Sequence, residues 1–465
     1  MSTSNLRHLP SVEKVLAALG ELDSPPRPTV VALVRDHVEH MREELLAGSA
    51  PLTFDEAVGS IRSGILAFAR QRIQPVINGT GVMIHTNLGR SPIHKDAMTV
   101  VSAVAAGYSN LELDLNTGER GSRGAFLEKN LSTLCKAEAA TVVNNCASAL
   151  VLILRELANG ERNEVIIGRN QLVEIGGGFR VPEILETSGA RLREVGATNR
   201  VSVDDYRKAI NAKTGMILRV HRSNFYMEGF VEEPTTAELV ALAREFDLPV
   251  VEDLGSGAMV ATDELAPLDH EPTTAEVLAD EVDLVCVSGD KLFGGPQAGI
   301  IAGKRELIAR LKKNPFFRAL RCDKMVLTAL QESACAYLEA SQSGATPDLP
   351  LIAMLTVEVD TLNTRATAII EAIGKGETVT RGEGTSRCGG GTMPKSQIPS
   401  VTIDIAPVAG QYSLPQLMKR LRDGRPPVIG YVSENALKLD LRTIPAEQDS
   451  VLISAIREAL AHPSE

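Results

Sequence analysis

The chain has no tryptophan, and aromatic residues make up only 3% of its 465 residues. Proteins that bind single-stranded nucleic acid stack the bases on aromatic side chains, and this chain has few side chains that could form such a stacking surface. No apolar run approaches the roughly 20 residues that a membrane helix needs. The amino-terminal stretch also has no apolar segment of the kind found in signal peptides. We therefore expect a cytoplasmic protein with no membrane contact.

Cysteine and excess positive charge are also scarce. The six cysteines are scattered, with no CxxC pair and no Cys/His spacing typical of a metal site. This pattern disfavours a disulfide scaffold and a structural zinc site, and it indicates reduced, mostly buried thiols. With 48 basic and 59 acidic residues the net charge is −11. Nucleic-acid binders usually have a basic field, so any such binding would depend on a local patch.

Three regions with different patterns follow one another along the chain. Residues 1–72 have apolar residues at helical spacing, with Thr53 and Glu56 in a capping-box arrangement before one helix. Residues 73–318 alternate short β-rich runs with helical stretches, which favours a parallel-rich sheet covered on both faces. Residues 319–465 complete the chain as a linker helix and a small α+β domain. We predict these three ranges as domains.

The carboxy-terminal region gives further local predictions. We expect one long helix over residues 315–342, a second helix over 351–373 and a loop over 382–397. In the middle region, ligands of a parallel sheet bind beyond the carboxyl ends of its strands. The polar residues at those ends are therefore the first candidates for chemistry.

The first candidate is the segment VDLVCVSGDKLFGGPQAGIIAG, in which an apolar strand ends in Ser288, Gly289, Asp290 and Lys291. A partly desolvated lysine above a cleft suits Schiff-base chemistry, and the neighbouring glycines allow a ligand to approach closely. A solvated turn lysine is the alternative interpretation.

The second candidate is Asp253, which ends the apolar strand of LPVVEDLGSG. A carboxylate at this place could pair with the ring nitrogen of pyridoxal phosphate and keep that ring an electron sink. By itself, a turn or capping aspartate is the better explanation of the residue. Together with Lys291 it leads to a pyridoxal phosphate hypothesis.

The third candidate is the helix start after the strand of TVVNNCASALVLILREL. Free amides at Cys146, Ala147 and Ser148 suit a phosphate group, and the Ser148 hydroxyl can add a hydrogen bond. An ordinary helix cap is the alternative. Ser288 is a second candidate phosphate ligand. We interpret the Cys146 side chain as packing rather than nucleophilic, because no base is adjacent in the sequence.

Three long motifs carry a specific resemblance. INGTGVMIHTNLGRSP (77–92), ETSGARLREVGATNR (186–200) and VSGDKLFGGPQAGIIAGK (287–304) resemble the bacterial selenocysteine synthase family, the L-seryl-tRNA(Sec) selenium transferases. The similarity runs over nearly the whole chain. It implies the α/β fold of the PLP-dependent transferases, aspartate aminotransferase-like (fold type I). It also implies that the small helical amino-terminal domain binds tRNA(Sec).

The resemblance also implies roles for single residues. Lys291 matches the cofactor lysine, and Arg90, Arg318 and Arg321 match positions that bind the anionic selenium donor. Arg318 and Arg321 are three residues apart, so we expect them to share a helix face. We further suggest that Asp290 orients Lys291 or the leaving group. Arg120 and Arg123 are weaker loop candidates, and we interpret His85 and His221 as structural.

The implied reaction converts L-seryl-tRNA(Sec) to L-selenocysteinyl-tRNA(Sec). Selenophosphate adds to a PLP-bound aminoacrylyl-tRNA, and the enzyme works as a homodecamer, a ring of dimers with active sites at the dimer interfaces. One alternative is a PLP-dependent β-eliminating lyase or desulfurase acting on a free amino acid, which would leave the helical domain unexplained. A second is a tRNA-binding scaffold without catalysis, which the retained lysine, aspartate and phosphate loop oppose.

Overall fold

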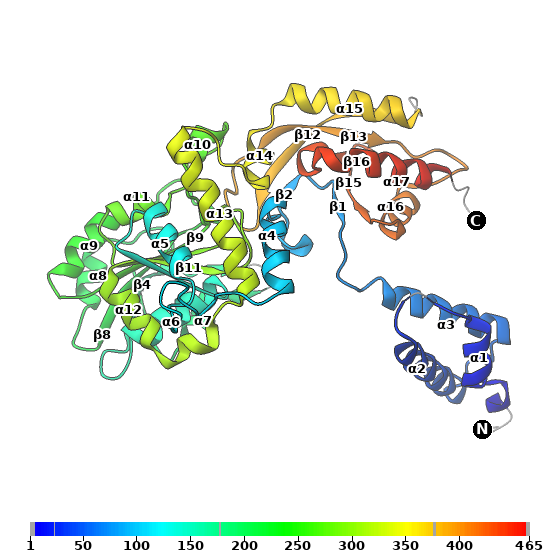
Figure 1. Ribbon diagram of the computed structural model, residues 1–465, viewed down its shortest axis with the longest axis horizontal. Coiled ribbons are helices and arrows are strands. Elements are labelled where there is room, and N and C mark those ends of the chain that lie inside the picture. The colour runs from blue at the N-terminus through cyan, green and yellow to red at the C-terminus, as the bar shows by residue number, and fades with distance from the viewer. Residues whose placement is uncertain (1–4, 23, 176–177, 375–377, 462–465) are drawn as a thin grey trace. The chain divides into compact units, whose positions relative to one another are not determined.

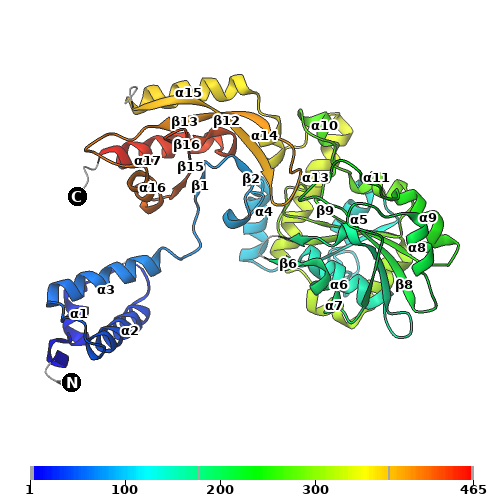
Figure 2. The ribbon, with the colours of Figure 1, turned by 180° about the vertical axis from the view of Figure 1, so that it is seen from behind.

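The protein was analysed as a computed structural model that describes residues 5–22, 24–175, 178–374 and 378–461. The chain forms two compact units, Met1–Pro75 and Val76–Glu465, which we describe separately. Figures 1 and 2 show their elements from opposite sides.

The first unit is a small helical domain. Its core joins Val15, Val34, Ile61 and Ile65, all fully buried, from three helices. The predicted capping box is present, because Thr53 and Glu56 each accept a backbone hydrogen bond from the other. The helices expected from the apolar spacing are therefore confirmed. The elements are η1 (Asn5–His8), α1 (Val12–Leu19), α2 (Arg27–Leu46) and α3 (Phe54–Ala69).

A seven-stranded sheet in the order β3-β11-β10-β9-β8-β4-β7 is the centre of the second unit. All its strands run parallel except β11, which is antiparallel to both of its neighbours. The β-rich runs of the sequence thus become the expected parallel-rich sheet. The strands are β3 (Ala139–Val143), β4 (Glu164–Gly168), β7 (Arg191–Val195), β8 (Thr214–Val220), β9 (Val250–Gly255), β10 (Leu284–Ser288) and β11 (Gly299–Gly303).

Helices cover both faces of this sheet (Figures 1 and 2). Successive residues of one strand enter different cores: Ile166 belongs to one apolar cluster, whereas Val165 and Ile167 belong to the other. This period of two is what a strand buried on both faces requires. The helices here are α4 (Lys95–Ala106), α5 (Ala125–Leu134), α6 (Cys146–Leu157), α7 (Val181–Glu186), α8 (Val203–Ala209), α9 (Thr236–Arg244), α10 (Thr262–Leu265), α11 (Thr274–Ala279), α12 (Arg305–Lys313) and α13 (Lys324–Ser343), with η2 (Thr86–Leu88), η3 (Arg169–Gln171), η4 (Pro315–Leu320) and the hairpin of β5 (Glu174–Ile175) and β6 (Phe179–Arg180).

A second sheet in the order β15-β16-β13-β12-β2 gathers the carboxy-terminal elements. Residues 77–84, which our division assigned to 73–318, pair with this region: β1 with β14, and β2 with β12. The three-domain division stays a prediction. The strands are β1 (Ile77–Asn78), β2 (Val82–Ile84), β12 (Val379–Gly389), β13 (Ile398–Ile405), β14 (Val428–Ile429), β15 (Tyr431–Ser433) and β16 (Ala436–Asp440); the helices are α14 (Pro350–Thr356), α15 (Val359–Ile373), α16 (Leu414–Asp423), η5 (Leu441–Thr443), η6 (Ala446–Gln448) and α17 (Asp449–Ala461).

The prediction of two long continuous helices in this part of the chain is wrong, because each range is divided between two helices. The first becomes η4 and α13, separated where Asp323 caps α13 by accepting from the amides of Met325 and Val326. The second becomes α14 and α15. There the buried Arg442 guanidinium donates to the carbonyls of Met354 and Val357 at 2.9 Å and satisfies the end of α14.

The loop expected over residues 382–397 is also wrong in its first half, which is strand β12. Glycine there is required by packing rather than by a turn. A Cβ at Gly382 would lie 2.2 Å from Asp404, and one at Gly384 would lie 2.7 Å from Thr402. The glycines let β12 lie directly beneath side chains of its partner strand β13.

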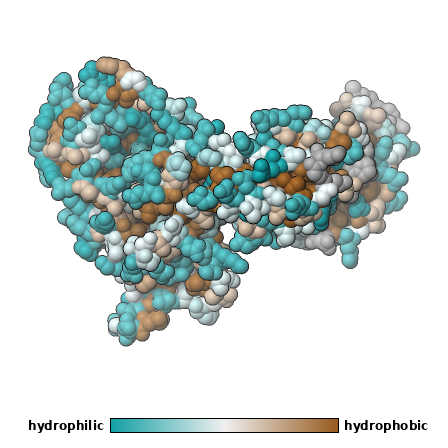
Figure 3. All heavy atoms as spheres, turned by 90° about the horizontal axis from the view of Figure 1, so that it is seen from above, coloured by the Kyte–Doolittle hydropathy of each residue, from teal (hydrophilic) through white to brown (hydrophobic). Residues whose placement is uncertain are grey.

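The face drawn in Figure 3 is largely hydrophilic, with apolar residues scattered among polar ones. Among the described residues, no helix is both long and apolar enough to cross a membrane.

Candidate active site

The candidate residues come together at one edge of the seven-stranded sheet. Strands β3, β9 and β10 run in the same direction, and their carboxyl ends carry the predicted site segments. The helix start follows β3, Lys291 follows β10, and Asp253 lies within β9, two residues before its end. The helix start at Cys146, the carboxylate of Asp253 and the amine of Lys291 therefore belong to the same edge, as the rule for parallel strands predicts.

Lys291 lies in a tightly packed turn after β10. Only 8% of its surface is exposed, and the neighbouring Ser288 is equally buried. The Tyr337 hydroxyl fixes the turn by donating to the carbonyls of Leu292 and Phe293 at 3.2 Å. The turn after β9 packs against the same segment, since a Cβ at Gly257 would lie 2.6 Å from the Ser288 carbonyl oxygen. The amine is thus held in a rigid, largely dehydrated place.

Asp253 is a buried carboxylate beside this lysine. Burial raises the pKa of Asp253, while the charge of Lys291 acts in the opposite direction. Two thiols, those of Cys146 and Cys286, lie 3.5 and 3.6 Å from the Oδ1 atom of Asp253. The acid and the amine are therefore electrostatic partners, as expected of a pair that acts on one ring.

The predicted phosphate loop forms the start of α6. Asn145 caps this helix by accepting from the Ser148 amide at 2.8 Å, so that amide is engaged by the protein itself. The amides of Cys146 and Ala147 belong to the first helical turn, where no intrahelical carbonyl is available. Gly299 of β11 allows the loop to come close, because a Cβ there would lie 2.2 Å from the Asn145 carbonyl oxygen.

Arg90 and Asp290 form an ion pair across 200 positions of sequence, with Nη1 2.7 Å from Oδ2. The Asp290 side chain is 7% exposed and that of Arg90 27%. The other carboxylate oxygen of Asp290 is buried and has no hydrogen-bond partner among the described residues. Arg90 has a left-handed φ of 67° and closes its turn by donating its amide to the His85 carbonyl. Asp290 thus contacts Arg90, whereas our hypothesis related it to Lys291 or the leaving group.

A group of arginines surrounds one acid that the sequence analysis missed. Glu112 accepts from Arg120 at 2.8 Å, from Arg123 at 3.1 Å and from Arg321 at 3.2 Å. The hydrogen bond from Arg123 is the main reason that the pKa of Glu112 lies below its usual value. No motif in the sequence predicts a role for Glu112. Its contacts with Arg120 and Arg321 form only when the loop and the segment of Arg321 fold together.

Arg318 lies apart from this group and is exposed. The expected shared helix face is wrong, since η4 ends at Leu320 and Arg321 already has extended backbone angles. Both arginines nevertheless line a cavity of about 410 Å³, together with Arg123, Lys312 and Lys313. Within the described ranges Arg318 has neither an ion pair nor a side-chain hydrogen bond, so its guanidinium remains available to an anion.

The two histidines differ in their surroundings. His221 contacts the buried acid Glu271 through Nε2 at 3.0 Å, which confirms a structural contact. The Nδ1 atom of His85, at the end of the strand that leads to Arg90, is buried and has no partner within the part of the chain that the structure describes.

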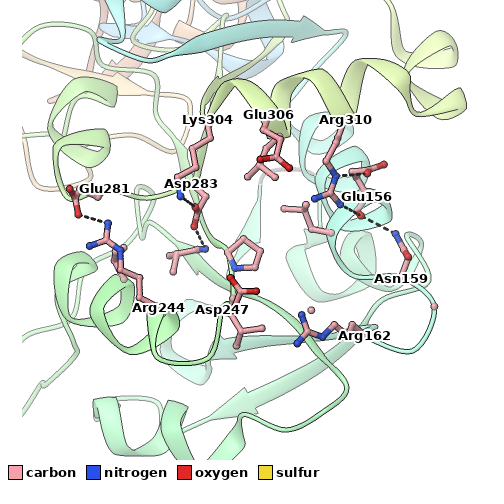
Figure 4. Close-up of a pocket in the computed structure, with 18 of the residues that line it drawn as sticks. Glu156, Asn159, Arg162, Arg244, Asp247, Glu281, Asp283, Lys304, Glu306 and Arg310 are labelled. Atoms are coloured by element: carbon pink, nitrogen blue, oxygen red, sulfur yellow. Dashed lines mark hydrogen bonds and ion pairs between the residues drawn. The ribbon is translucent and has the colours of Figure 1, made fainter.

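A larger cavity of about 980 Å³ lies elsewhere, near the amino ends of β9 and β10 (Figure 4). Three ion pairs lie in its lining: Arg310 pairs with Glu156, Lys304 with Asp283, and Arg244 with Glu281. None of the predicted site residues lines it. This cavity is therefore a weaker candidate than the edge at Lys291.

Similarity to known proteins covers most of the chain. The model of the L-seryl-tRNA selenium transferase family matches residues 76–445. The chain belongs to this family. It is 43% identical to the L-seryl-tRNA(Sec) selenium transferase of Maridesulfovibrio salexigens, over 98% of this chain and all of that one. The relative from Aquifex aeolicus is 40% identical over 98% of this chain and 99% of its own.

A solved structure extends the comparison to the fold of this selenium transferase family member. D-glucosaminate-6-phosphate ammonia-lyase matches with a TM-score of 0.58 and 21% identity, covering 86% of this chain and 99% of that one. The fold is that of the PLP-dependent transferases of fold type I, as predicted, with its one antiparallel strand inside a parallel sheet.

The residues of this transferase family member fit the cofactor of that fold. A buried carboxylate and a buried lysine lie near the ends of adjoining strands, and the lysine charge lowers the pKa of the carboxylate. A helix start with free first-turn amides lies at the same edge. Acid, amine and anion-binding amides are the three donor types that pyridoxal phosphate requires.

Proposed function

We propose that this protein converts L-seryl-tRNA(Sec) to L-selenocysteinyl-tRNA(Sec), with pyridoxal phosphate as cofactor and selenophosphate as selenium donor. The convergence of Lys291 and Asp253 in one buried site carries the proposal. Membership of the selenium transferase family over residues 76–445 supports the substrate.

Four parts of the chain would hold the cofactor. The Lys291 amine would bind its aldehyde carbon, and the ionised Asp253 carboxylate would accept a hydrogen bond from its protonated ring nitrogen. The amides of Cys146 and Ala147, with the hydroxyls of Ser148 and Ser288, bind its phosphate. When bound, pyridoxal phosphate supplies an electron sink for the electron pair released as the Cα–H bond of serine breaks.

Lys291 also moves protons in this proposal. The Nζ atom of Lys291 would accept the Cα proton of the serine bound at this site. The packed turn fixed by Tyr337 holds Nζ at that place and limits access of water. The β-hydroxyl leaves as water after receiving a proton from an acid in the site. Asp290 holds Arg90 beside this turn through their ion pair.

The arginines supply the site of the selenium donor. Selenophosphate is a compact anion, and guanidinium groups bind such oxygens through paired hydrogen bonds. Arg90, Arg318 and Arg321 are its proposed ligands. Glu112 holds Arg321 in place by its hydrogen bond, and Arg318 enters the same cavity without a competing partner in the described structure.

The remaining partners follow from the substrate. We assign tRNA(Sec) binding to the helical unit, and we place the reaction in the cytoplasm, where aminoacyl-tRNA is used. We also propose a homodecamer built as a ring of dimers. Tyr108, Leu115 and Phe126 support contact with another copy, because they expose 107%, 72% and 59% of their surface as large apolar side chains.

The decisive experiment incubates purified protein with seryl-tRNA(Sec) and no selenium donor. We expect loss of water from the tRNA-linked serine, measured as the mass of the aminoacyl nucleoside after nuclease digestion. The Lys291→Ala variant should show no such loss. Free serine serves as the second control and should not react.

The opposite result favours the alternative function. Turnover of free serine or cysteine, with none of seryl-tRNA(Sec), would indicate a β-eliminating lyase or desulfurase and refute the proposed function. Protein that binds no cofactor and still binds tRNA would indicate a scaffold.

A further inference from the structure

Two cysteines and an aspartate form a buried cluster at the candidate site. The Sγ atoms of Cys146 and Cys286 lie 3.5 and 3.6 Å from one oxygen, Oδ1 of Asp253. The three side-chain ligand atoms all lie within 4.8 Å of one another. Cys286 is fully buried and Asp253 is 8% exposed, so water does not provide these contacts.

Two separate elements bring the thiols to the acid. Strands β9 and β10 run parallel in a register that pairs Cys286 with Asp253. Cys146 is the first residue of α6, whose start is fixed by the Asn145 cap. The second thiol therefore reaches Asp253 from the helix over the sheet, 107 positions away in the sequence.

The thiols act as donors to the carboxylate. A hydrogen bond with Cys146, together with burial, raises the pKa of Cys286 well above its usual value, so its sulfur keeps its proton. Burial raises the pKa of Asp253, and the charge of Lys291 and the two thiol hydrogen bonds oppose that rise. Both thiol donors thus favour the ionised form of Asp253, which is buried away from water.

The two carboxylate oxygens are used differently. Oδ1 accepts from both thiols, whereas Oδ2 has no hydrogen-bond partner in the described part of the chain. A carboxylate offers about four acceptor positions on its two oxygens. Occupying one oxygen orients the group and leaves the other for a single donor from the cleft.

We propose that Cys146 and Cys286 are positioning residues that direct Oδ2 of Asp253 toward the ring nitrogen of the cofactor and keep this carboxylate ionised. The inference rests on the proposed cofactor and assigns these thiols no bond to substrate. It differs from our interpretation of Cys146 as a packing residue, because the thiol contributes a specific hydrogen bond.

The test uses the full-length protein and removes the donors one at a time. Cys146→Ala, Cys286→Ala and the double variant lose the S–H group, whereas Cys286→Ser keeps a donor and guards against a packing defect. Cys388→Ala is the matched control. Cys388 is also a buried thiol, but its sulfur contacts the sulfur of Met393 at 3.7 Å and not Asp253.

Two readouts do not depend on catalysis. The dissociation constant of pyridoxal phosphate is measured by titration of the apoprotein, and the visible absorption of the bound cofactor is followed against pH. We expect the double variant to bind pyridoxal phosphate roughly tenfold more weakly, which corresponds to about 1.4 kcal/mol. Its absorption should also shift at a pH where the wild type and Cys388→Ala are unchanged. Cys286→Ser should lie nearer the wild type than Cys286→Ala.

An Asp253→Asn background separates positioning from packing. If the thiols act through the carboxylate, the cysteine substitutions should have no further effect there. Equal weakening in both backgrounds, or a double variant that matches Cys388→Ala, would overturn the inference. So would a stoichiometric zinc ion that is present in the purified wild type and lost in the double variant.

These outcomes are distinct from failure of the proposed function. If the wild-type protein binds no pyridoxal phosphate, the cofactor site is wrong and this inference fails with it. If the wild type binds the cofactor and the cysteine variants bind and titrate like it, only the inference fails.

Discussion

The ion pair between Arg90 and Asp290 gives a prediction with a definite asymmetry. The Asp290 side chain is 7% exposed. One of its oxygens is bound to Arg90, and the other has no partner in the described ranges. Arg90→Met would leave the buried carboxylate with no partner for either oxygen. Arg90 itself is 27% exposed, so after Asp290→Asn its guanidinium can still be hydrated. The two substitutions break the same contact but should differ in cost.

The magnitudes follow from burial. Removing one partner of a buried ion pair costs about 3–5 kcal/mol, and the partial exposure of Arg90 places Arg90→Met near 3 kcal/mol. Asp290→Asn should cost about 1 kcal/mol, because only a hydrogen bond is weakened. The double variant should cost less than the sum by at least about 1 kcal/mol, since the two residues are in contact.

The assay is urea unfolding followed by far-ultraviolet circular dichroism, because the chain has no tryptophan to report by fluorescence. Arg120→Met is the control. Its pair with Glu112 is also an arginine–carboxylate contact, at 2.8 Å, but Arg120 is 76% exposed. An exposed pair contributes at most about 1 kcal/mol. Equal losses for Arg90→Met and Asp290→Asn, or full additivity, would refute the assignment of Asp290 as a buried charge that depends on Arg90.

Three further predictions concern other parts of the site. Burial raises the pKa of Asp253, so the ionisation of Asp253 lowers the stability of the fold as the pH rises from about its usual 3.8 through the raised value. The Asp253→Asn apoprotein should therefore melt at a higher temperature than the wild type at pH 7, and this difference should vanish at acid pH. A difference that does not change with pH would contradict the buried charge. Gly299→Ala places a Cβ 2.2 Å from the Asn145 carbonyl oxygen, which must push the phosphate loop away from β11. We expect at least roughly tenfold weaker pyridoxal phosphate binding, about 1.4 kcal/mol. Gly59→Ala is the control, because a Cβ there meets open space without a left-handed backbone, and it should bind pyridoxal phosphate as the wild type does. Arg318→Ala should raise the KM for selenophosphate by roughly tenfold or more, as expected for a lost hydrogen bond to a charged group, while water loss from seryl-tRNA(Sec) continues; loss of both activities would place Arg318 elsewhere in the mechanism.

Local sequence patterns predicted most of the individual elements. Strands buried on both faces appear as short apolar runs such as EVIIG, and the Thr53 capping box marks its helix start from four residues alone. Patterns of this kind work because each depends on neighbours within one turn or one strand. The predictions failed where a distant group decided the outcome. Arg442 ends α14 from 85 positions away, and Asp404 and Thr402 explain why β12 contains glycines.

For the site, the polar residues near strand ends predicted the chemistry before any contact was known. The sequence placed Lys291, Asp253 and the helix start of α6 at strand ends, and parallel strands bring their carboxyl ends to one edge. The groups that support them follow from long-range contacts in the fold. The contact of Glu112 with Arg321 joins residues 209 positions apart, and the contact of Cys146 with Asp253 joins residues 107 positions apart. A side chain that touches its partner across a hundred or more positions leaves no periodic trace in the sequence, because the chain path between them sets the distance.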